Sequence, residues 1–379
     1  MKIAIIGTRG IPNNYGGYEQ ITEQLAEGLI RKGHEVTVYN SHNHPNQLKR
    51  WKGITIQHCY DPEYILGTAG QFVYDLNCIR HARKNDFDVW LFMGYTSSSV
   101  WRMLFPKNSI IISNMDGMEW KRAKYSKPVQ RFLKYAEKLA VNHSQFHIAD
   151  SSAIKEYLDN FYSINCQFIP YGATLPSVQR KNVLRKYKAR KGEYYLLIAR
   201  MEPENNIEMI LDGFHLSCTQ RKFLVIGKTD NKFGKYLVNK FSADKRIEFL
   251  GGLFHQETVH TLRANTAMYF HGHSVGGTNP SLLEAMASEA LIAAHDNVFN
   301  KSVLGVDAFY FSDSNDVKEL VETRPDTSLA SNFMNANVEK IKQSYNWEKI
   351  VNSYEEFICH CYQNAKSETN FKPEGYAYK

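Results

Sequence analysis

The chain opens with MKIAIIGTRGIPNNYGGYEQITEQLAEGLIRKGHEVTVY (residues 1–39), and this stretch decides the fold. Residues 3–6 form a short apolar run, which is typical of a strand buried on both faces. A glycine-bearing loop follows, and apolar residues then recur at helical spacing as far as Leu29. A second apolar run covers residues 36–39. This order predicts a βαβ unit and therefore a parallel sheet.

Composition and length place the chain among globular proteins. It has 379 residues, of which 43% are hydrophobic and 22% are charged, and this length favours two domains. No apolar run approaches the ~20 residues that a spanning helix needs. The amino terminus reaches Gly7 too soon for a signal-peptide core, and the six scattered cysteines suit free thiols. We therefore expect a cytoplasmic protein.

Short apolar runs that alternate with helical patterns continue along the chain. The pattern pauses in a polar, basic stretch after residues 170–172 and resumes with a strand at residue 194. The fold class predicted is therefore α/β, with two Rossmann-like domains. The predicted domains are 1–174, 175–345 and a carboxyl-terminal helix, 346–379, that returns to the first domain.

Ligands of open parallel sheets bind beyond the carboxyl ends of the strands, so the loops at these ends are the candidate sites. In the first loop, Arg9 and Pro12 stand where a dinucleotide fingerprint requires glycine, which disfavours a nicotinamide cofactor. Gly16 and Gly17 lead directly into a helix, where backbone N–H groups can meet a phosphate or a sugar. A simple flexible turn is the alternative.

A second glycine-rich loop precedes a helix near residue 280. Asn279 is a candidate cap for that helix, and this arrangement leaves the N–H groups of Ser281 and Leu282 free for an anion. Glu284, one turn further on, suits hydrogen bonds from a ribose diol. The alternative interpretation of Glu284 is a solvated helix residue.

These residues carry a resemblance to a known family. Residues 273–287 resemble the donor-binding segment of retaining family 4 glycosyltransferases, which are two-domain enzymes of the GT-B fold with a central cleft. The likeness covers most of the chain and extends to bacterial rhamnosyltransferases of surface-polysaccharide assembly. The other segments that carry it are Gly16–Gly17, residues 170–173, Arg200, residues 345–347, GTRGIP at 7–12 and NMDGMEWKR at 114–122.

The resemblance implies a retaining transfer of a sugar, with dTDP-rhamnose as donor. Arg200 is then the main catalytic residue, because its charge stabilises the departing diphosphate. Asn206 and its neighbour stand where the family usually places a lysine, so Arg200 carries more of that charge, together with Lys228. The family's usual glutamate eight residues before Glu284 is Gly276 here, so contacts to the sugar must differ.

The resemblance also implies a saccharide acceptor that is lipid-linked at the inner face of the membrane. Asp116 follows a strand and suits orienting or deprotonating the acceptor hydroxyl, although a turn-forming role is equally open. The basic, aromatic segment 120–138 suits contact with anionic lipid or simply a solvated helix face. We expect no cofactor and no nucleic acid. We also expect no metal, because the paired carboxylates Asp86 and Asp88 precede their strand, whereas ligands bind beyond the carboxyl ends of the strands.

Two other functions stay open on the sequence. One is a two-lobed sugar-binding protein without catalysis, and the other is a nucleotide-sugar epimerase of related fold. Labelled nucleotide sugars distinguish these functions from a transferase. A transferase needs an acceptor to use the nucleotide sugar, and an epimerase converts it without one. A binding protein leaves the nucleotide sugar unchanged.

Overall fold

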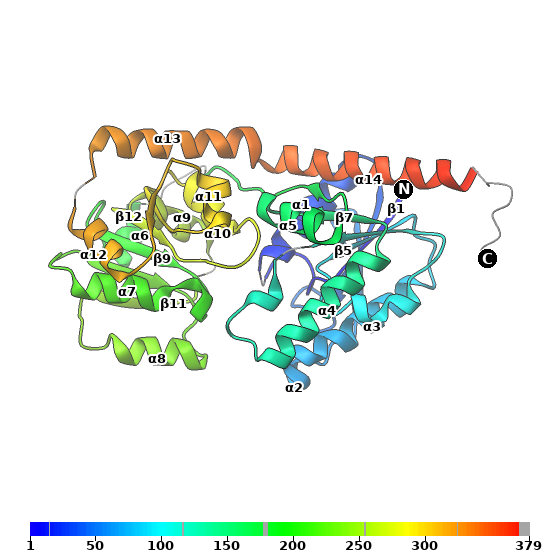
Figure 1. The fold of residues 1–379 in the computed structure, drawn as a ribbon, viewed down its shortest axis with the longest axis horizontal. Helices are drawn as coiled ribbons and strands as arrows, with labels where there is room; N and C mark the ends of the chain where they lie inside the picture. Colours follow the sequence, from blue (N-terminus) through cyan, green and yellow to red (C-terminus); the bar gives the residue numbers. More distant parts are fainter. Residues whose placement is uncertain (15, 116, 177–180, 254, 324, 371–379) are drawn as a thin grey trace. The chain divides into compact units, whose positions relative to one another are not determined.

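The computed structural model describes residues 1–14, 16–115, 117–176, 181–253, 255–323 and 325–370. The chain folds into two compact units (Figure 1). The first unit comprises Met1–Asp116, Arg131–Pro170 and Trp347–Lys379, and the second comprises Gly117–Gln130 and Tyr171–Asn346.

The first unit is built on an eight-stranded sheet of order β3-β4-β2-β1-β5-β6-β7-β8, in which β3 alone is antiparallel to its neighbour. Its central strands β5 and β6 are buried along their whole length and mostly apolar, because a parallel sheet is covered on both faces. The strands are β1 (Lys2–Ile6), β2 (Glu35–Ser41), β3 (Arg50–Trp51), β4 (Ile54–Cys59), β5 (Val89–Met93), β6 (Ile110–Asn114), β7 (Phe146–Ala149) and β8 (Gln167–Phe168).

Helices cover both faces of this sheet. Ala4, Tyr39 and Trp90 pack with α3 in one apolar cluster, whereas α1 packs beside α14. The helices are α1 (Gly17–Arg31), α2 (Glu63–Leu66), α3 (Gly70–Ala82), α4 (Lys127–His143), α5 (Ser152–Tyr162) and α14 (Trp347–Asn370), with short 3-10 turns η1 (Gly67–Ala69), η2 (Ser99–Leu104) and η3 (Glu119–Lys121).

The carboxyl-terminal helix α14 is part of the first unit. A Cβ on Gly28 of α1 would lie 2.3 Å from Val351 of α14, so the two helices meet where one residue has no side chain. Tyr354 is fully buried, and its hydroxyl accepts a hydrogen bond of 2.9 Å from Asn114 on β6. Trp347–Asn370 is therefore a structural part of the first unit.

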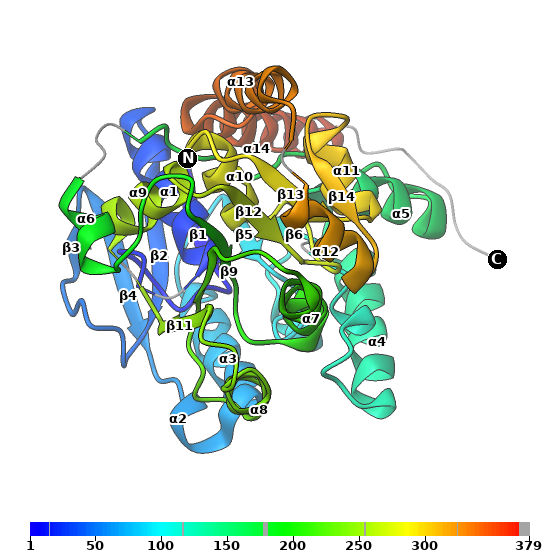
Figure 2. The same cartoon turned by 90° about the vertical axis from the view of Figure 1, so that its left-hand side faces the viewer.

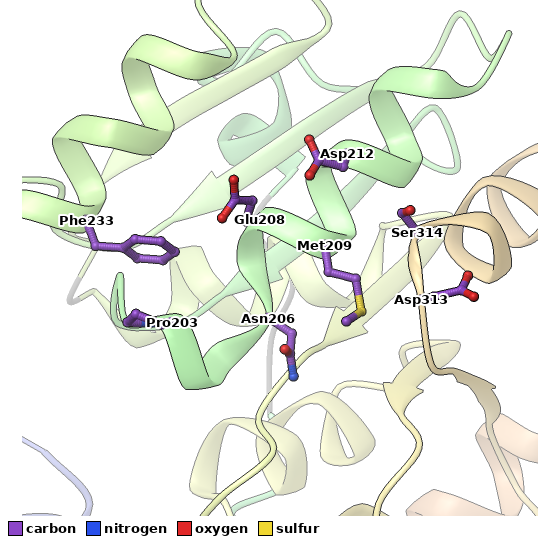
Figure 3. Close-up of a pocket in the computed structure, with 8 residues that line it drawn as sticks. All are labelled: Pro203, Asn206, Glu208, Met209, Asp212, Phe233, Asp313 and Ser314. Carbon is purple, nitrogen blue, oxygen red and sulfur yellow. The ribbon is translucent and has the colours of Figure 1, made fainter. Parts of the chain in front are cut away.

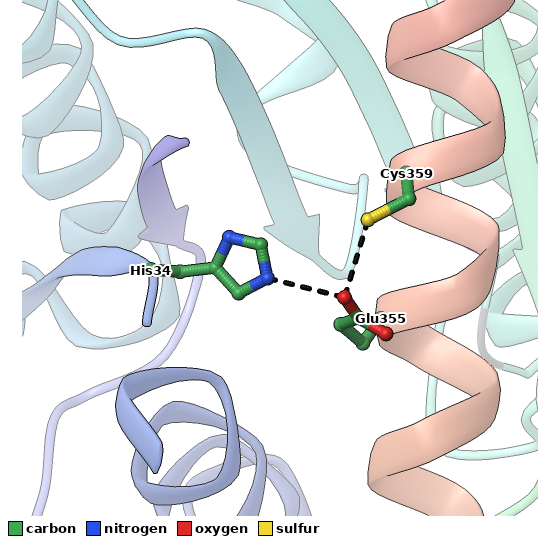
Figure 4. A group of neighbouring side chains, drawn as sticks. All are labelled: His34, Glu355 and Cys359. Carbon is green, nitrogen blue, oxygen red and sulfur yellow. Dashed lines mark hydrogen bonds and ion pairs between the residues drawn. The ribbon is translucent and has the colours of Figure 1, made fainter. Parts of the chain in front are cut away.

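A polar group joins α14 to the loop before β2 (Figure 4). The Glu355 carboxylate is 3.3 Å from His34 Nε2 and accepts a hydrogen bond of 3.2 Å from Cys359. Lys32 Nζ lies 3.6 Å from the same carboxylate. The side chains of His34, Glu355 and Cys359 are of types that can ligate a metal. The ammonium group of Lys32 already balances the one carboxylate among them, however, which favours a structural ion-pair cluster.

The second unit is built on a six-stranded parallel sheet of order β11-β10-β9-β12-β13-β14 (Figure 2). Its strands are β9 (Tyr194–Ile198), β10 (Lys222–Ile226), β11 (Ile247–Gly251), β12 (Met268–His271), β13 (Ile292–His295) and β14 (Phe309–Phe311). Its helices are α6 (Lys181–Lys186), η4 (Pro203–Asn205), α7 (Ile207–Leu216), α8 (Lys232–Lys240), α9 (Gln256–Ala264), α10 (Pro280–Ala287), α11 (Val298–Leu304), α12 (Ser314–Glu322) and α13 (Thr327–Ser344).

The core of the second unit lies between the sheet and the helices α7, α8 and α12. Leu197, Phe223 and Phe270 from the sheet pack against Phe214 of α7 and Val317 of α12, and all are almost fully buried. Two α/β units with parallel sheets confirm the predicted fold class.

One segment differs from the predicted domain boundaries. Gly117–Gln130 lies with the second unit, although the predicted first domain ran to residue 174. Ion pairs explain this association, because Arg122 lies 3.6 Å from Glu204 and Lys124 lies 3.9 Å from Glu202. Such pairs depend on the folded chain and have no signal in local sequence.

Across the described residues, every helix is too short or too polar to cross a bilayer.

Candidate functional site

The candidate site lies at the carboxyl ends of β9 and β12, which are neighbours in the second sheet. The loop after β9 covers residues 199–206, and the loop after β12 covers residues 272–279. Together they hold three of the site residues predicted from the sequence, Arg200, Asn206 and Asn279, and the second loop leads into the helix that carries Ser281, Leu282 and Glu284.

Hydrogen bonds fix these two loops against each other. Asn206 Nδ2 donates to the Gly272 carbonyl at 2.8 Å, and the N–H and hydroxyl of Ser274 donate to the Glu204 carbonyl at 3.1 and 2.8 Å. A Cβ on Gly272 would lie only 2.1 Å from the Asn205 carbonyl oxygen, so this close approach requires glycine. The loops therefore form one rigid rim.

Arg200 stands on this rim with its side chain exposed. Its carbonyl accepts a hydrogen bond of 2.7 Å from Asn205 Nδ2, which fixes the backbone. Among the residues that the structure describes, no acceptor forms a hydrogen bond or ion pair with its guanidinium. A fixed backbone and an uncommitted cation suit the binding of an anion.

Asn206 commits its side-chain amide nitrogen to the rim. It adopts a left-handed backbone conformation (φ 50°) at the start of α7, and its amide nitrogen is committed to Gly272. The structure thus places Asn206 as a residue that shapes the rim. Lys228 is exposed two residues beyond β10, at the same edge of the sheet as Arg200.

The start of α10 corrects one expectation. Asn279 caps the helix as predicted, but its side-chain oxygen accepts the Ser281 N–H at 2.9 Å, and its carbonyl accepts the Leu282 N–H at 3.0 Å. These two N–H groups are therefore not free for an anion. The physical reason is the cap itself, because it satisfies the donors that would otherwise be open.

Glu284 is paired with an arginine that sequence reasoning missed. Arg263 of α9 is 2% exposed, and its Nη1 lies 2.7 Å from a Glu284 carboxylate oxygen. Arg263 also donates to the Ser281 hydroxyl at 2.9 Å, and Tyr269 lies 2.8 Å from that hydroxyl. The pair fixes the carboxylate one turn into α10, so Glu284 is more than a solvated helix residue.

A second group that the sequence did not reveal surrounds Glu204. Its carboxylate is buried, and neither oxygen has a hydrogen-bond partner among the described residues. Arg122 lies 3.6 Å away and forms a shorter pair of 2.7 Å with Glu119. Gly117–Gln130 thus brings an arginine and a carboxylate to the rim of the second unit.

Gly16 and Gly17 lie in the first unit, at the start of α1. A Cβ on Gly16 would lie 3.4 Å from a Glu19 carboxylate oxygen, and Glu19 also accepts the Arg9 N–H at 2.8 Å. This negative charge in the first turn of α1 opposes a phosphate there. Of the two ligands expected, the arrangement favours a neutral sugar hydroxyl.

Asp116, predicted to act on the acceptor, lies outside the described residues. The paired carboxylates before β5 are described, and Asp88 accepts hydrogen bonds from the Lys2 N–H at 2.7 Å and from the Tyr362 hydroxyl at 3.1 Å. Asp88 is therefore committed to holding α14 and the amino terminus.

Two histidines stack at the end of β12. The rings of His271 and His273 are 4.4 Å apart between centroids and tilted by only 14°. Burial and the charges of Arg200 and Arg122 lower the pKa of His273 to about 3. Burial, with His273 and Arg263, also lowers the pKa of His271 well below its usual value. Both imidazoles are therefore neutral at physiological pH.

These pKa values predict acid sensitivity. Unfolded histidine takes up a proton near pH 6.5, whereas the folded protein keeps both rings neutral, so their stabilisation is complete above pH 6.5. As the pH falls from 6.5 toward 3, each ring reduces the free energy of unfolding by up to about 1.4 kcal/mol per pH unit. Urea unfolding at pH 7.5 and 5.0 measures this loss.

The control for this prediction is the double variant His271→Phe/His273→Phe. Its stability should fall less than that of the native protein between the two pH values, because neither ring can be protonated. Equal losses in the two proteins would contradict the assignment.

A pocket of about 410 Å³ lies between α7, α8 and α12, and Asn206 is one of its lining residues (Figure 3). Its walls include Glu208, Asp212 and Asp313. Three carboxylates repel a diphosphate, so this pocket is a poor candidate for the donor site. The Arg200 rim is the stronger candidate.

Two family models match parts of the chain. Residues 179–324 match the family model described as glycosyl transferases group 1, and residues 1–174 match a domain of unknown function, DUF1972. No curated protein matches the chain. The match to residues 179–324 covers both loops of the Arg200 rim. Gly117–Gln130 lies outside that match.

Solved structures establish the fold. Sucrose-phosphate synthase from Thermosynechococcus elongatus is 16% identical with a TM-score of 0.79, over 96% of this chain and 99% of that one. Anabaena HepE in complex with UDP and glucose is 16% identical with a TM-score of 0.75, over 95% and 100%. A TarM variant from S. aureus, in complex with Fondaparinux, alpha-GlcNAc-glycerol and UDP, is 10% identical with a TM-score of 0.68, over 95% and 99%. The chain has the GT-B fold, and the family match supports a glycosyltransferase.

Proposed function

We propose that the protein is a retaining glycosyltransferase, which moves a sugar from a nucleoside-diphosphate donor to a saccharide acceptor. The observation that carries the proposal is the exposed guanidinium of Arg200 on a rim of fixed loops at the carboxyl ends of β9 and β12. This edge of a parallel sheet is where such folds bind nucleotides. The match to glycosyl transferases group 1 covers the same loops.

The chemistry follows from charge. Departure of the nucleoside diphosphate builds negative charge on its outer phosphate, and Arg200 stabilises that charge more strongly in the transition state than in the bound donor. Lys228 adds a second positive charge at the same edge. Glu284, oriented by Arg263, accepts hydrogen bonds from the ribose diol.

Retention is proposed to proceed by attack on the face from which the diphosphate leaves. The leaving phosphate takes the proton of the acceptor hydroxyl, so no protein nucleophile is needed. Asp116 is proposed to orient that hydroxyl, or to take its proton in place of the leaving phosphate, and Gly16–Gly17 to contact sugar hydroxyls.

A thermal-shift panel of nucleoside diphosphates tests the donor. A ligand that binds the folded protein at 100 times its dissociation constant stabilises it by about 2.7 kcal/mol. Structural neighbours are described with UDP, whereas the resemblance to rhamnosyltransferases implies dTDP. A shift with one of these and none with nucleoside monophosphates supports the proposal, and no shift with any nucleotide contradicts it.

Turnover separates the transferase from the other functions. Incubation with labelled nucleotide sugars, with and without saccharide acceptors, should give labelled saccharide only when an acceptor is present. Interconversion of the donor without acceptor would identify an epimerase. Tight binding of free sugar with no turnover would identify a binding protein.

Transfer is expected to proceed without a metal, because Arg200 supplies positive charge at the proposed diphosphate site. EDTA should therefore leave the initial rate within about twofold of the untreated value, as judged against the 10²-fold effects of losing a catalytic charge. Loss of activity in EDTA that added magnesium restores would overturn this expectation.

We also propose that the acceptor is lipid-linked and that α4 contacts the membrane surface. Val129, Phe132 and Tyr135 are exposed apolar residues on α4. Seven basic residues lie between Lys121 and Lys138, in α4 or just before it. Five of them are exposed: Lys121, Lys124, Lys127, Arg131 and Lys138. Sedimentation with vesicles containing phosphatidylglycerol, compared with neutral vesicles, measures this contact.

A further inference from the structure

The stacked histidines at the end of β12 have a feature that packing does not explain. His271 is 1% exposed, and neither of its ring nitrogens has a hydrogen-bond partner among the described residues. Nδ1 of His273 is buried and equally without a partner in that part of the chain. Buried polar atoms of this kind are rare in folded proteins and call for an explanation.

The backbone at His273 is, by contrast, held by many hydrogen bonds. Its carbonyl accepts from Asn297 Nδ2 at 3.0 Å and from Asn300 Nδ2 at 3.1 Å. On either side, Gly272 and Ser274 are tied to the loop after β9. Hydrogen bonds from the loop after β9 and from the start of α11 thus fix the backbone that carries a ring with an unsatisfied nitrogen.

The surroundings of His273 are those of an anion-binding site. Arg200 and Arg122 are close enough to affect its ionisation, and His271 stacks on the inner face of its ring. Arg200 is the proposed ligand of the diphosphate. His273 is only partly buried, and its Nε2, unlike Nδ1, is not one of the buried ring nitrogens, so a ligand on the rim can reach Nε2.

We infer that His273 is a positioning and binding residue for the donor, which donates a ring N–H hydrogen bond, as a neutral imidazole, to an oxygen of the diphosphate. The inference rests on the proposed function. A neutral imidazole carries one N–H donor at any pH above its pKa. With two arginines beside it, a protonated ring would be repelled, whereas a neutral donor adds a directed hydrogen bond beside the charge of Arg200.

Two substitutions separate this role from simple packing. His273→Phe keeps an aromatic ring on His271 and removes the N–H, whereas His273→Asn keeps a neutral N–H donor and loses the stack. The Phe variant is expected to keep its Tm within about 3 °C of the native value. This is less than the shift that a stability loss of about 1 kcal/mol produces in a small domain. Its kcat/KM is expected to fall by about 10²-fold. The Asn variant should keep activity within about tenfold, with a lower Tm.

His271→Phe is the matched control, because it keeps the stack and changes no group on the rim. Its kcat/KM should equal that of the native protein. The pH profile gives a second readout, because a neutral donor predicts no loss of kcat/KM as the pH rises from 6 to 8, whereas an imidazolium would be lost through pH 6.5.

The outcomes are distinguishable from those of the proposed function. If the native protein neither binds UDP or dTDP nor transfers sugar, the proposed function fails. If the native protein is active and His273→Phe is equally active, or if His273→Phe and His273→Asn lose activity alike, the inference about His273 is overturned while the transferase stands.

Discussion

Replacing Arg200 by alanine should reduce kcat/KM for sugar transfer by about 10²- to 10³-fold, because the departing diphosphate loses its main fixed cation. The side chain is exposed and has no partner among the described residues. Its removal therefore leaves no buried group unsatisfied, and the Tm without ligand should change little. The loss should appear both in initial rates and in the thermal shift with nucleoside diphosphate.

Arg190 provides the matched control for this experiment. It is an exposed arginine of the same unit, before β9 rather than after it, and so stands at the opposite end of that strand. Arg190→Ala removes the same charge and should leave transfer unchanged. Equal activity of Arg200→Ala and the native protein would remove the basis of the proposed donor site.

Replacing Glu284 by alanine should destabilise the free protein by about 3 kcal/mol, before any nucleotide is added. Arg263 is 2% exposed, and the substitution would leave its guanidinium buried without its carboxylate. Breaking a buried ion pair by removing one partner typically costs about 3–5 kcal/mol, and the partial exposure of Glu284 places this case at the lower end. Urea unfolding without ligand measures the effect.

The double variant Arg263→Met/Glu284→Ala is the control for the pair. It removes both charges, so its stability should recover part of the loss seen in Glu284→Ala. A nucleotide-binding defect should persist in both variants, because Glu284 is the proposed ribose ligand. If Glu284→Ala is as stable as the native protein, the ion pair does not support α10.

The main strands could be predicted because each contains an unbroken apolar run. Val89–Met93 is such a run, and it forms β5. The missed strands include β4 at Ile54–Cys59 and β14 at Phe309–Phe311. β4 mixes apolar and polar residues, and β14 is only three residues long at the edge of its sheet, so neither contains a long apolar run.

The site was predictable where local chain chemistry decides it. Asn279 followed by proline marks a helix start, and the structure has that cap. The occupied N–H groups of Ser281 and Leu282 show how the same cap removes the anion site inferred from it. Arg263 was missed because it reaches Glu284 from the preceding helix, a pairing that depends on how α9 and α10 pack.

The order in which the chain supplies its two units has a consequence for biosynthesis. The first unit needs α14, whose residues follow all of the second unit in the sequence. On the ribosome, the second unit therefore has all of its residues available while the first still lacks the helix that covers Gly28 and bonds to Asn114. A nascent chain stalled before Trp347 should present the unfinished first unit, with an uncovered apolar surface, to chaperones and proteases.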